Sequence, residues 1–364
     1  MQVALICNSA FGTDGISMSV MNNHRYLKKD GMTYHLIYSS IHSPKEVVDG
    51  YVSTFCKDGD KATFINKGNG LLAFARKLYE YLMYEKVDVV HVNGSSSAIL
   101  LEIVVAKMVG VRKIISHAHS TGSSHPVVHK LLRTFVNMLV DERLACSEMA
   151  GQWMYGRRKS FTIIPNCINT ADYTFDIDVR NAVRKELAIG NDVTVIGHVG
   201  TFTEVKNQSF LLHMMKSLSS RDVSNHMLLL IGHGPLKENV MKECEELELN
   251  DSVLFLGNRN DVPRLLMAMD VFCMPSLYEG FPITSVEAQA TGLPQILSSN
   301  ITSDVCITDL VRFLPIDQGV EIWSEEIKQI ATIENKREYY AARIKAAGYD
   351  IHYSAEMLER IYTM

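Results

Sequence analysis

Short apolar runs that alternate with helix-length segments, in two successive series, constrain the fold of this chain more than any other feature. Such runs predict buried strands, and the segments between them predict helices that cover both faces of a parallel sheet. The runs are residues 3–7, 34–38, 87–92, 114–117, 144–147 and 162–165, and then 193–199, 227–231, 252–256, 271–274 and 295–297. Residues 168–192 interrupt the pattern with charged and turn residues. We therefore expect an α/β protein with two doubly wound domains that face each other across a cleft, with ligand groups at the carboxyl ends of the strands.

Length and composition agree with this division. The 364 residues exceed the size of one typical core, and 47% hydrophobic with 21% charged residues is ordinary for a globular protein. The seven cysteines are odd in number and lack C-x-x-C spacing, which predicts a reducing cytoplasm and no structural zinc. We expect neither a signal peptide nor a membrane span, because no apolar run has the required length.

The two halves of the chain differ in charge. Residues 1–175 carry 19 Lys and Arg against 14 Asp and Glu, and the remainder carries 17 against 27, so the net −5 divides into +5 and −10. The basic half is a candidate for contact with an anionic surface, such as the inner face of a membrane, or with a phosphate-bearing acceptor. Charges scattered over a solvated face would give the same count. Nucleic acid is not expected as a partner, because the sequence has no basic-aromatic stripe.

The segment 275–287 places two carboxylates, Glu279 and Glu287, eight residues apart across a predicted strand–loop–helix junction. A short buried strand is predicted for residues 271–274 and a helix for residues 284–291. Glu279 then lies on the loop and Glu287 lies one turn into the helix. The free N–H groups around the start of this helix favour phosphate, and they belong to Phe281, Ile283 and Thr284.

Glu287 has a second interpretation on the sequence. Together with Thr284 it matches the S/T-x-x-E pattern of a capping box, in which the glutamate would only cap the helix. Both interpretations are open at this stage.

Other loops after predicted strands carry glycines or a lysine. The loop at residues 8–17, with Gly12 and Gly15, would allow close backbone approach by a substrate, or is simply a flexible turn. It is not G-x-G-x-x-G, which argues against a dinucleotide-binding dehydrogenase. Lys206 lies at a predicted helix start, where lysine is electrostatically disfavoured, and this favours a role as a cation for phosphate over that of a surface lysine. Two further strand-end loops are residues 231–235, with Gly232 and Gly234, and residues 257–262, with Arg259.

These motifs, in this order, resemble the retaining glycosyltransferases of family 4, which have the GT-B fold. The resemblance covers nearly the whole chain. YEGFP at 278–282, followed by EAQATGLP at 287–294, is similar to the paired-glutamate signature of that family. Like that signature, it follows a glycine–lysine loop and a G-x-G-P turn. IPNCIN at 164–169 is similar to the interdomain element of the family. SHAH at 116–119 and ACSE at 145–148 are similar to members that build bacterial exopolysaccharide or capsule.

The resemblance implies that Glu279 contacts the hydroxyls of the donor sugar, Glu287 the nucleotide ribose and Lys206 the diphosphate. It also implies that the ring or backbone of His119 meets the transferred sugar. We therefore expect catalytic roles for Glu279, His119 and Lys206. The expected donor-binding set is Gly15, Thr201, Lys206, Gly232, Gly234, Arg259, Glu279, Gly280, Phe281, Pro282, Ile283, Thr284 and Glu287.

Thr201 departs from the family pattern, which usually has arginine five residues before the lysine. Arginine would clamp the donor phosphates with two hydrogen bonds, whereas threonine offers one hydroxyl. Either Lys206, the amides of residues 281–284 and the glycine loop at residues 12–15 are sufficient, or donor turnover is weak.

Stabilisation of the leaving diphosphate is expected to need no metal and no other cofactor. Lysine and oriented amides can stabilise the negative charge on the leaving oxygen. The D-x-D spacings at 58–60 and 176–178 lie away from the donor motifs, and we interpret them as solvated turns. His117 and His119 alternate at a strand end, so both rings should point to one face. Two ligands without a third do not predict a metal site.

The C-terminus predicts an amphipathic helix with apolar residues at 357, 358, 361 and 362. By the resemblance, this helix crosses back onto the first domain. We thus expect an acceptor-side domain of residues 1–170 plus 350–364, and a nucleotide-sugar-binding domain of residues 171–349.

The leading hypothesis is a cytoplasmic retaining glycosyltransferase that moves a sugar from a uridine diphosphate donor to a saccharide or lipid-linked acceptor in polysaccharide synthesis. One alternative is a nucleotide-sugar epimerase with a similar fold. Another is a noncatalytic partner subunit that binds nucleotide sugar, which Thr201 motivates.

Overall fold

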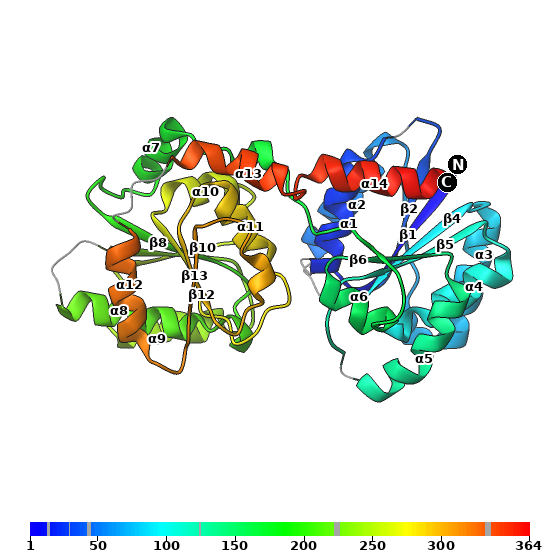
Figure 1. The fold of residues 1–364 in the computed structure, drawn as a ribbon, viewed down its shortest axis with the longest axis horizontal. Helices are drawn as coiled ribbons and strands as arrows, with labels where there is room; N and C mark the ends of the chain where they lie inside the picture. Colours follow the sequence, from blue (N-terminus) through cyan, green and yellow to red (C-terminus); the bar gives the residue numbers. More distant parts are fainter. Residues whose placement is uncertain (13–14, 29, 42–44, 124, 222–225, 332–335) are drawn as a thin grey trace. The chain divides into compact units, whose positions relative to one another are not determined.

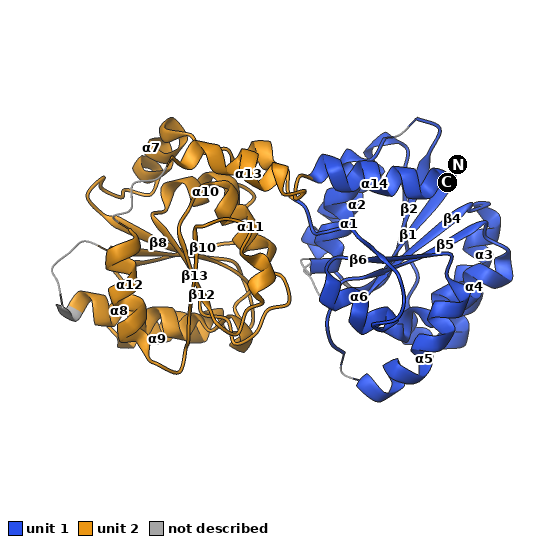
Figure 2. Cartoon of the chain, viewed as in Figure 1, with its two compact units in different colours: residues 1–167, 351–364 blue, residues 168–350 orange. Residues whose placement is uncertain are grey.

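The protein, as a computed structural model, divides into two compact units (Figure 2). Unit 1 is Met1–Cys167 with Ile351–Met364, and unit 2 is Ile168–Asp350. The residues that the structure describes are 1–12, 15–28, 30–41, 45–123, 125–221, 226–331 and 336–364.

Unit 1 has, in its described residues, a seven-stranded parallel sheet in the order β3-β2-β1-β4-β5-β6-β7 (Figure 1). The strands are β1 (Gln2–Phe11), β2 (Thr33–Ile41), β3 (Lys61–Phe64), β4 (Val89–Gly94), β5 (Lys113–Ala118), β6 (Glu142–Ala145) and β7 (Thr162–Ile163). The α-helices are α1 (Gly15–Tyr26), α2 (Lys45–Phe55), α3 (Leu71–Tyr84), α4 (Leu100–Val109), α5 (Pro126–Leu139), α6 (Glu148–Tyr155) and α14 (Ile351–Thr363). Short 3-10 turns are η1 (Cys56–Asp58), η2 (Lys67–Asn69) and η3 (Ser97–Ile99).

Alternate residues of each central strand feed two separate cores, one on each face of the sheet. In β1, Val3 and Leu5 pack with side chains of α1, α2 and α14, whereas Ala4 and Ile6 pack with those of α3, α4 and α6. This division follows from the two-residue period of a strand, and it explains why buried parallel strands are apolar on both faces.

Unit 2 has, in its described residues, a six-stranded parallel sheet in the order β10-β9-β8-β11-β12-β13. The strands are β8 (Thr194–Val199), β9 (His226–Ile231), β10 (Val253–Gly257), β11 (Val271–Met274), β12 (Gln295–Ser298) and β13 (Val311–Leu314). The α-helices are α7 (Ile177–Glu186), α8 (Gln208–Arg221), α9 (Lys237–Glu246), α10 (Val262–Ala268), α11 (Ile283–Ala290), α12 (Val320–Ile330) and α13 (Tyr340–Ala346). The 3-10 turns are η4 (Thr170–Tyr173), η5 (Glu204–Lys206), η6 (Ser303–Val305) and η7 (Arg337–Tyr339).

The C-terminal helix α14 belongs to unit 1, as expected from the resemblance. Ala355, Leu358 and Tyr362 are buried in the same core as the strands β1 and β2. Ser354 Oγ donates to Asn23 Oδ1 of α1 at 2.7 Å. Apolar burial and a buried hydrogen bond thus hold α14 on unit 1.

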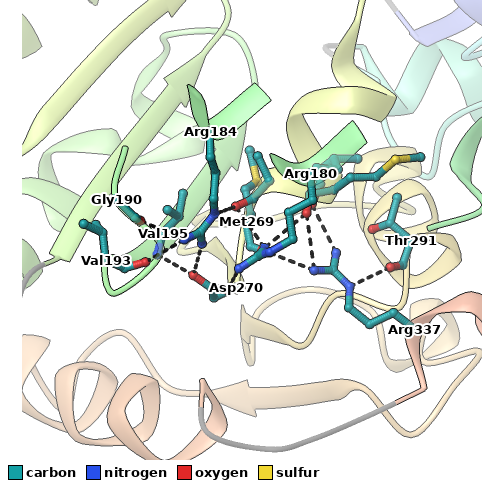
Figure 3. Close-up of polar contacts among 12 residues, drawn as sticks. Arg180, Arg184, Gly190, Val193, Val195, Met269, Asp270, Thr291 and Arg337 are labelled. Atoms are coloured by element: carbon teal, nitrogen blue, oxygen red, sulfur yellow. Dashed lines mark hydrogen bonds and ion pairs between the residues drawn. The ribbon is translucent and has the colours of Figure 1, made fainter. Parts of the chain in front are cut away.

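Three arginines gather around Asp270, at the amino end of β11 (Figure 3). Arg180 and Arg184 of α7 donate to its two carboxylate oxygens at 2.5 and 2.6 Å. Arg337 of η7 donates to the Met269 carbonyl at 2.9 Å, and burial lowers the pKa of Arg337 to about 9. The carbonyls at the end of α10 carry the negative end of a helix dipole, which offsets part of the excess positive charge. This cluster ties α7, α10 and η7 together at the end of the sheet opposite the carboxyl ends.

The interpretation of residues 58–60 as a solvated turn is wrong for Asp60, which is buried. His24 Nε2 lies 2.8 Å from its carboxylate, and the Tyr34 backbone N–H donates to it at 2.7 Å. The buried ring nitrogen of His24 and the buried N–H of Tyr34 both need a hydrogen-bond partner. The left-handed turn at Gly59 brings the Asp60 carboxylate to these two groups. Asp176, from the other D-x-D segment, is exposed and caps α7.

Among the described residues, none of the helices combines the length and the apolar character needed to cross a membrane.

Candidate functional site

The strand order of unit 2 reverses between β8 and β11. From β8 the chain continues to β9 and β10 on one side, and β11 then starts the other side. The loops that follow β8 and β11 therefore diverge from one point at the carboxyl edge of the sheet. Open parallel sheets bind ligands at such a switch point.

The loop after β8 lies directly against the loop after β9. Gly200 N–H donates to Ile231 O at 3.0 Å, and Phe202 N–H donates to His233 O at 3.1 Å. A Cβ at Gly232 would lie 2.1 Å from the Gly200 carbonyl oxygen, a distance that real side chains do not tolerate. A Cβ at Gly234 would meet the backbone of residue 202 at 2.5 Å. Both glycines are thus required to shape the site, whether or not they touch a ligand.

Lys206, on the loop after β8, and Glu279, on the loop after β11, form an ion pair through Nζ and Oε1. Lys206 ends η5, just before α8, and Asn207 follows in the αL conformation with φ of 54°. The Leu277 N–H donates to Val205 O at 2.8 Å, which holds the two loops together. Both partners of the pair are largely buried, with side-chain exposures of 20% and 17%. The sequence interpretation placed these residues in one site, and the structure brings them into contact.

The loop 275–282 is fixed from several directions. Glu279 forms an isolated parallel bridge with Ile301, and the Phe281 ring stacks on Tyr349 with a centroid distance of 5.7 Å. The helix α11 then begins at Ile283, after Pro282, and no side chain caps it. Its first N–H groups consequently lack intrahelical acceptors and form a positive end beside the ion pair on the same loop.

The capping interpretation of Glu287 is wrong. Its Oε1 accepts a hydrogen bond from Tyr173 OH at 2.8 Å. Burial raises the pKa of Glu287 to about 7, and the hydrogen bond from Tyr173 acts in the opposite direction. A half-buried carboxylate one turn into a helix, held by a tyrosine, is suited to accept hydrogen bonds from a diol. No sequence motif marks Tyr173, because it lies in the polar segment 168–192 that interrupts the strand pattern.

His198 on β8 was also missed. Its Nδ1 lies 2.9 Å from the Cys273 carbonyl oxygen, which makes Nδ1 the protonated nitrogen. Burial lowers its pKa to about 4, and the Lys206 charge contributes in the same direction. Its buried Nε2 has no hydrogen-bond partner among the described residues. His198 thus places a neutral hydrogen-bond acceptor close behind the Lys206 loop. The sequence signal that could have identified it was the position of the histidine in the segment GHVG at the end of the predicted strand.

Two expected donor-binding residues are placed differently from the rest. Arg259, on the loop after the edge strand β10, pairs with both carboxylate oxygens of Asp261 at 2.7 and 2.8 Å and with Glu186 at 3.3 Å. These carboxylates raise the pKa of Arg259. Thr201 is exposed, and its carbonyl accepts from Gln208 Nε2 at 3.1 Å. Any contact of either residue with a donor stays a prediction.

In unit 1 the strand order reverses between β1 and β4, and the glycine loop follows β1. Gly12 N–H donates to Ser17 Oγ at 3.2 Å, and Gly15 begins α1 with an exposed backbone. Residues 13 and 14 of this loop lie outside the described residues.

His119 follows β5, next to β4 in the sheet. Its Nε2 lies 3.0 Å from Asn93 Oδ1, while Asn93 Nδ2 donates to the His91 carbonyl at 3.3 Å. The second bond orients the amide, so His119 Nε2 carries the proton and Nδ1 is an acceptor. Burial lowers the pKa of His119 to about 4, and its Nδ1 has no partner among the described residues. The neutral ring can therefore accept a hydrogen bond from a hydroxyl.

His117 and His119 lie side by side as their alternation predicted, with ring centroids 4.1 Å apart. Behind them His117 Nδ1 lies 3.2 Å from His91 Nε2, and His91 Nδ1 lies 2.8 Å from Tyr362 OH of α14. The described residues contain no group of three or more His, Cys, Asp or Glu side chains placed to hold a metal ion.

Comparison with known proteins now assigns the chain to a family. The family described as Glycosyl transferases group 1 matches residues 179–347, and Glycosyltransferase Family 4 matches residues 13–172. A Bacillus subtilis protein named as the glycosyltransferase EpsF is 33% identical to this chain, over 71% of this chain and 70% of its own length. This chain belongs to glycosyltransferase family 4. It is an enzyme that transfers a glycosyl group from a nucleotide-sugar donor.

Two further proteins are similar to this chain. An Escherichia coli UDP-Gal:alpha-D-GlcNAc-diphosphoundecaprenol alpha-1,3-galactosyltransferase is 28% identical over 71% of this chain and 67% of its own. The crystal structure of HepE from Anabaena in complex with UDP has a TM-score of 0.78 over the full length of both chains, at 16% identity. The latter establishes the GT-B fold.

Proposed function

We propose that this family 4 enzyme transfers a hexose from a UDP-sugar, with retention of configuration, to a saccharide or lipid-linked acceptor in polysaccharide synthesis. The observation that carries the proposal is the Lys206–Glu279 pair at the switch point of unit 2, beside the free end of α11. One cation, one carboxylate and a row of amides in one place match a ligand that joins a diphosphate to a polyol.

Lys206 can hold the diphosphate without releasing Glu279. An ammonium group has three N–H donors, and Glu279 Oε1 occupies one of them. The remaining two can donate to phosphate oxygens, and the N–H groups at the start of α11 add donors that need no reorganisation. The charge that develops on the leaving diphosphate is thereby stabilised.

Glu279 retains one carboxylate oxygen, Oε2, for the hydroxyls of the sugar. Lys206 holds the carboxylate in place, so that its orientation is set before the donor binds. From unit 1, His119 supplies a neutral acceptor at Nδ1, which can receive a hydrogen bond from a sugar hydroxyl. Glu287, held by Tyr173, is assigned to the ribose diol.

The comparisons support the choice of nucleotide and acceptor. HepE structures are described with UDP and with UDP-glucose, and the Escherichia coli relative is named for UDP-galactose and a diphosphoundecaprenol acceptor. The ground for polysaccharide synthesis is the resemblance of residues 116–119 and 145–148 to family members that build bacterial exopolysaccharide or capsule.

Two measurements test the function. A thermal-shift screen of UDP- and GDP-sugars should show that UDP-sugars raise the melting temperature most, because a ligand that binds the native state stabilises it. The selected donor is then incubated with and without a diphosphoundecaprenyl-linked sugar, and products are followed by mass spectrometry. Transfer that needs the acceptor supports the proposal. Conversion of the donor to its epimer without acceptor would identify an epimerase, and binding without any product would identify a noncatalytic subunit.

Glu279→Gln supplies the matched variant for this assay. The carboxylate lies on a loop, so the variant should keep its melting temperature and lose most of its turnover. Full turnover in a folded Glu279→Gln enzyme would contradict the assigned role.

A further inference from the structure

Two tyrosines near the two ends of unit 2 contact residues of the candidate donor site. Tyr173 lies in η4, shortly after the first residue of the unit, and Tyr349 is the penultimate residue of the unit. The two segments that carry them are joined, because the Ile168 N–H donates to the Tyr349 carbonyl at 3.0 Å. We call residues 168–173 and 349–350 the terminal segments of unit 2.

Buried polar contacts hold the terminal segments together. Ile168 forms a parallel bridge with Asp350, and the Asp350 carboxylate accepts a hydrogen bond from Thr170 Oγ1. Thr170 and Asp350 are both buried, with 4% of each residue exposed. Because a buried carboxylate needs such a donor, this contact fixes the two segments against each other.

Each tyrosine contacts a different end of the proposed donor site. Tyr173 OH donates to Oε1 of Glu287, the carboxylate that we assign to the ribose, at 2.8 Å. The Tyr349 ring stacks on the Phe281 ring, with centroids 5.7 Å apart and an angle of 5° between the planes. Phe281 lies two residues after Glu279, the carboxylate that we assign to the sugar. The terminal segments therefore reach the nucleotide end through one tyrosine and the sugar end through the other.

The helix α11 has a separate anchor. Ser285 Oγ donates to Gln295 Oε1 of β12 at 2.7 Å, and Gln289 Nε2 donates to the last carbonyl of η6 at 2.8 Å. Ser285 and Gln289 are fully buried. The helix and the N–H groups at its start should therefore keep their positions when Tyr349 is changed. The turn at residues 280–282, in contrast, would lose the ring that stacks on its own aromatic side chain.

We infer that Tyr349 is a positioning residue of this glycosyltransferase, which holds Phe281 and thereby sets the turn between Glu279 and α11. Parallel stacking at this distance is a favourable geometry for aromatic pairs. A displacement of about 1 Å in a group that orients the substrate can lower a rate by about a hundredfold. Tyr349 should therefore control the rate of transfer, whereas Tyr173 should control the affinity for the nucleoside. The inference rests on the proposed function, because it takes Glu279 as the group that binds the transferred sugar.

Kinetics and titration of matched variants test the inference, with the selected UDP-sugar and the diphosphoundecaprenyl-linked acceptor. In Tyr349→Leu, kcat should fall by about tenfold or more, while calorimetric affinities for uridine and UDP change by about threefold at most. Tyr349→Phe keeps the ring and should retain kcat within about twofold. Tyr339→Leu, which replaces a tyrosine of η7 that is 57% exposed, should match wild type.

Tyr173→Phe should give the opposite pattern. It removes the hydroxyl that holds Glu287, so the affinity for uridine should fall by about fivefold or more, and by a larger factor than kcat does. Phe281→Leu supplies a second variant of the stacked pair, and its loss of kcat should equal that of Tyr349→Leu. Circular dichroism melting shows whether each variant is folded.

A folded Tyr349→Leu enzyme with the kcat of wild type would overturn the inference. So would a Tyr349→Phe enzyme that loses as much as Tyr349→Leu, because the hydroxyl and not the ring would then be responsible. Equal losses of uridine affinity and kcat in Tyr349→Leu would show that Tyr349 only supports the fold. Failure of the proposed function is visible separately, as absence of transfer by wild type or as full turnover in Glu279→Gln, and it would overturn both.

Discussion

Replacement of Lys206 by methionine should weaken binding of phosphate-bearing ligands selectively. Methionine keeps most of the length of the side chain and removes its charge. Two N–H donors that Glu279 does not use are lost to the diphosphate, in a setting where the lysine side chain is only 20% exposed. Hydrogen bonds to charged groups contribute about 1.5–3 kcal/mol each and are not additive, so we expect a loss of about 2–4 kcal/mol in UDP affinity, or roughly thirty- to thousand-fold.

Isothermal titration with UDP and with uridine measures this effect. Uridine has no phosphate, so its affinity should change by about threefold at most, which corresponds to less than 1 kcal/mol. Part of the loss for UDP comes from Glu279, whose carboxylate would repel the phosphates once its cation is gone. The double variant Lys206→Met/Glu279→Gln should accordingly bind UDP better than Lys206→Met does. Equal losses for UDP and uridine would show that Lys206 only supports the fold of the loop.

Four other predictions concern Glu287, Thr201 and Asp270. Because burial raises the pKa of Glu287 to about 7, UDP-glucose affinity should increase from pH 6 to 8 in wild type and stay flat in Glu287→Gln; a parallel slope in the variant would exclude Glu287 as the titrating ribose ligand. The pKa of Glu287 in the folded protein, about 7, lies above the usual value of 4.5. Ionisation of Glu287 should therefore reduce thermal stability as the pH rises from the usual value to the raised one, and Glu287→Gln should remove that component. Thr201→Arg, at an exposed position, should tighten UDP binding by about 1.5–3 kcal/mol if a cation position is unfilled, and titration that finds no gain in a folded variant would refute this. Asp270→Asn leaves the arginines of α7 without their carboxylate and should lower the free energy of unfolding by about 3–5 kcal/mol; a chemical-denaturation midpoint equal to that of wild type would show that the backbone carbonyls alone suffice.

Every apolar run that predicted a strand became one, although run 162–165 became only the short, exposed edge strand β7. The central strands gave the clearest signal, because a strand buried on both faces of a parallel sheet must be apolar at nearly every position. The two strands that the sequence analysis missed, β3 and β13, are short edge strands. Their residues are exposed or half-buried, with none fully buried. An edge strand gains its pairing from a neighbour that is remote in the sequence, so its own residues carry little of the signal.

For the site, the local sequence marked both glutamates and Lys206, but it did not mark Tyr173 or His198 and did not define what these residues do to one another. The motif around residues 278–287 marked both glutamates. Only the structure showed that Glu279 is paired with Lys206, 73 residues away, and that Glu287 is held by Tyr173, 114 residues away. The same holds for Asp60, which looked like a turn residue until the fold enclosed it with His24.

The sequence by itself determined the α/β class, the repeated strand pattern and the family, and it predicted the loops that we propose carry the chemistry. These depend on local periodicity, on backbone conformations that only glycine adopts readily, and on charged residues at strand ends. The tertiary structure decided which carboxylate pairs with Lys206, which carboxyl group has its pKa raised by burial and which histidine nitrogen accepts. The physical reason is that burial and hydrogen-bond partners set protonation and exposure, and both arise from residues that lie far apart in the sequence.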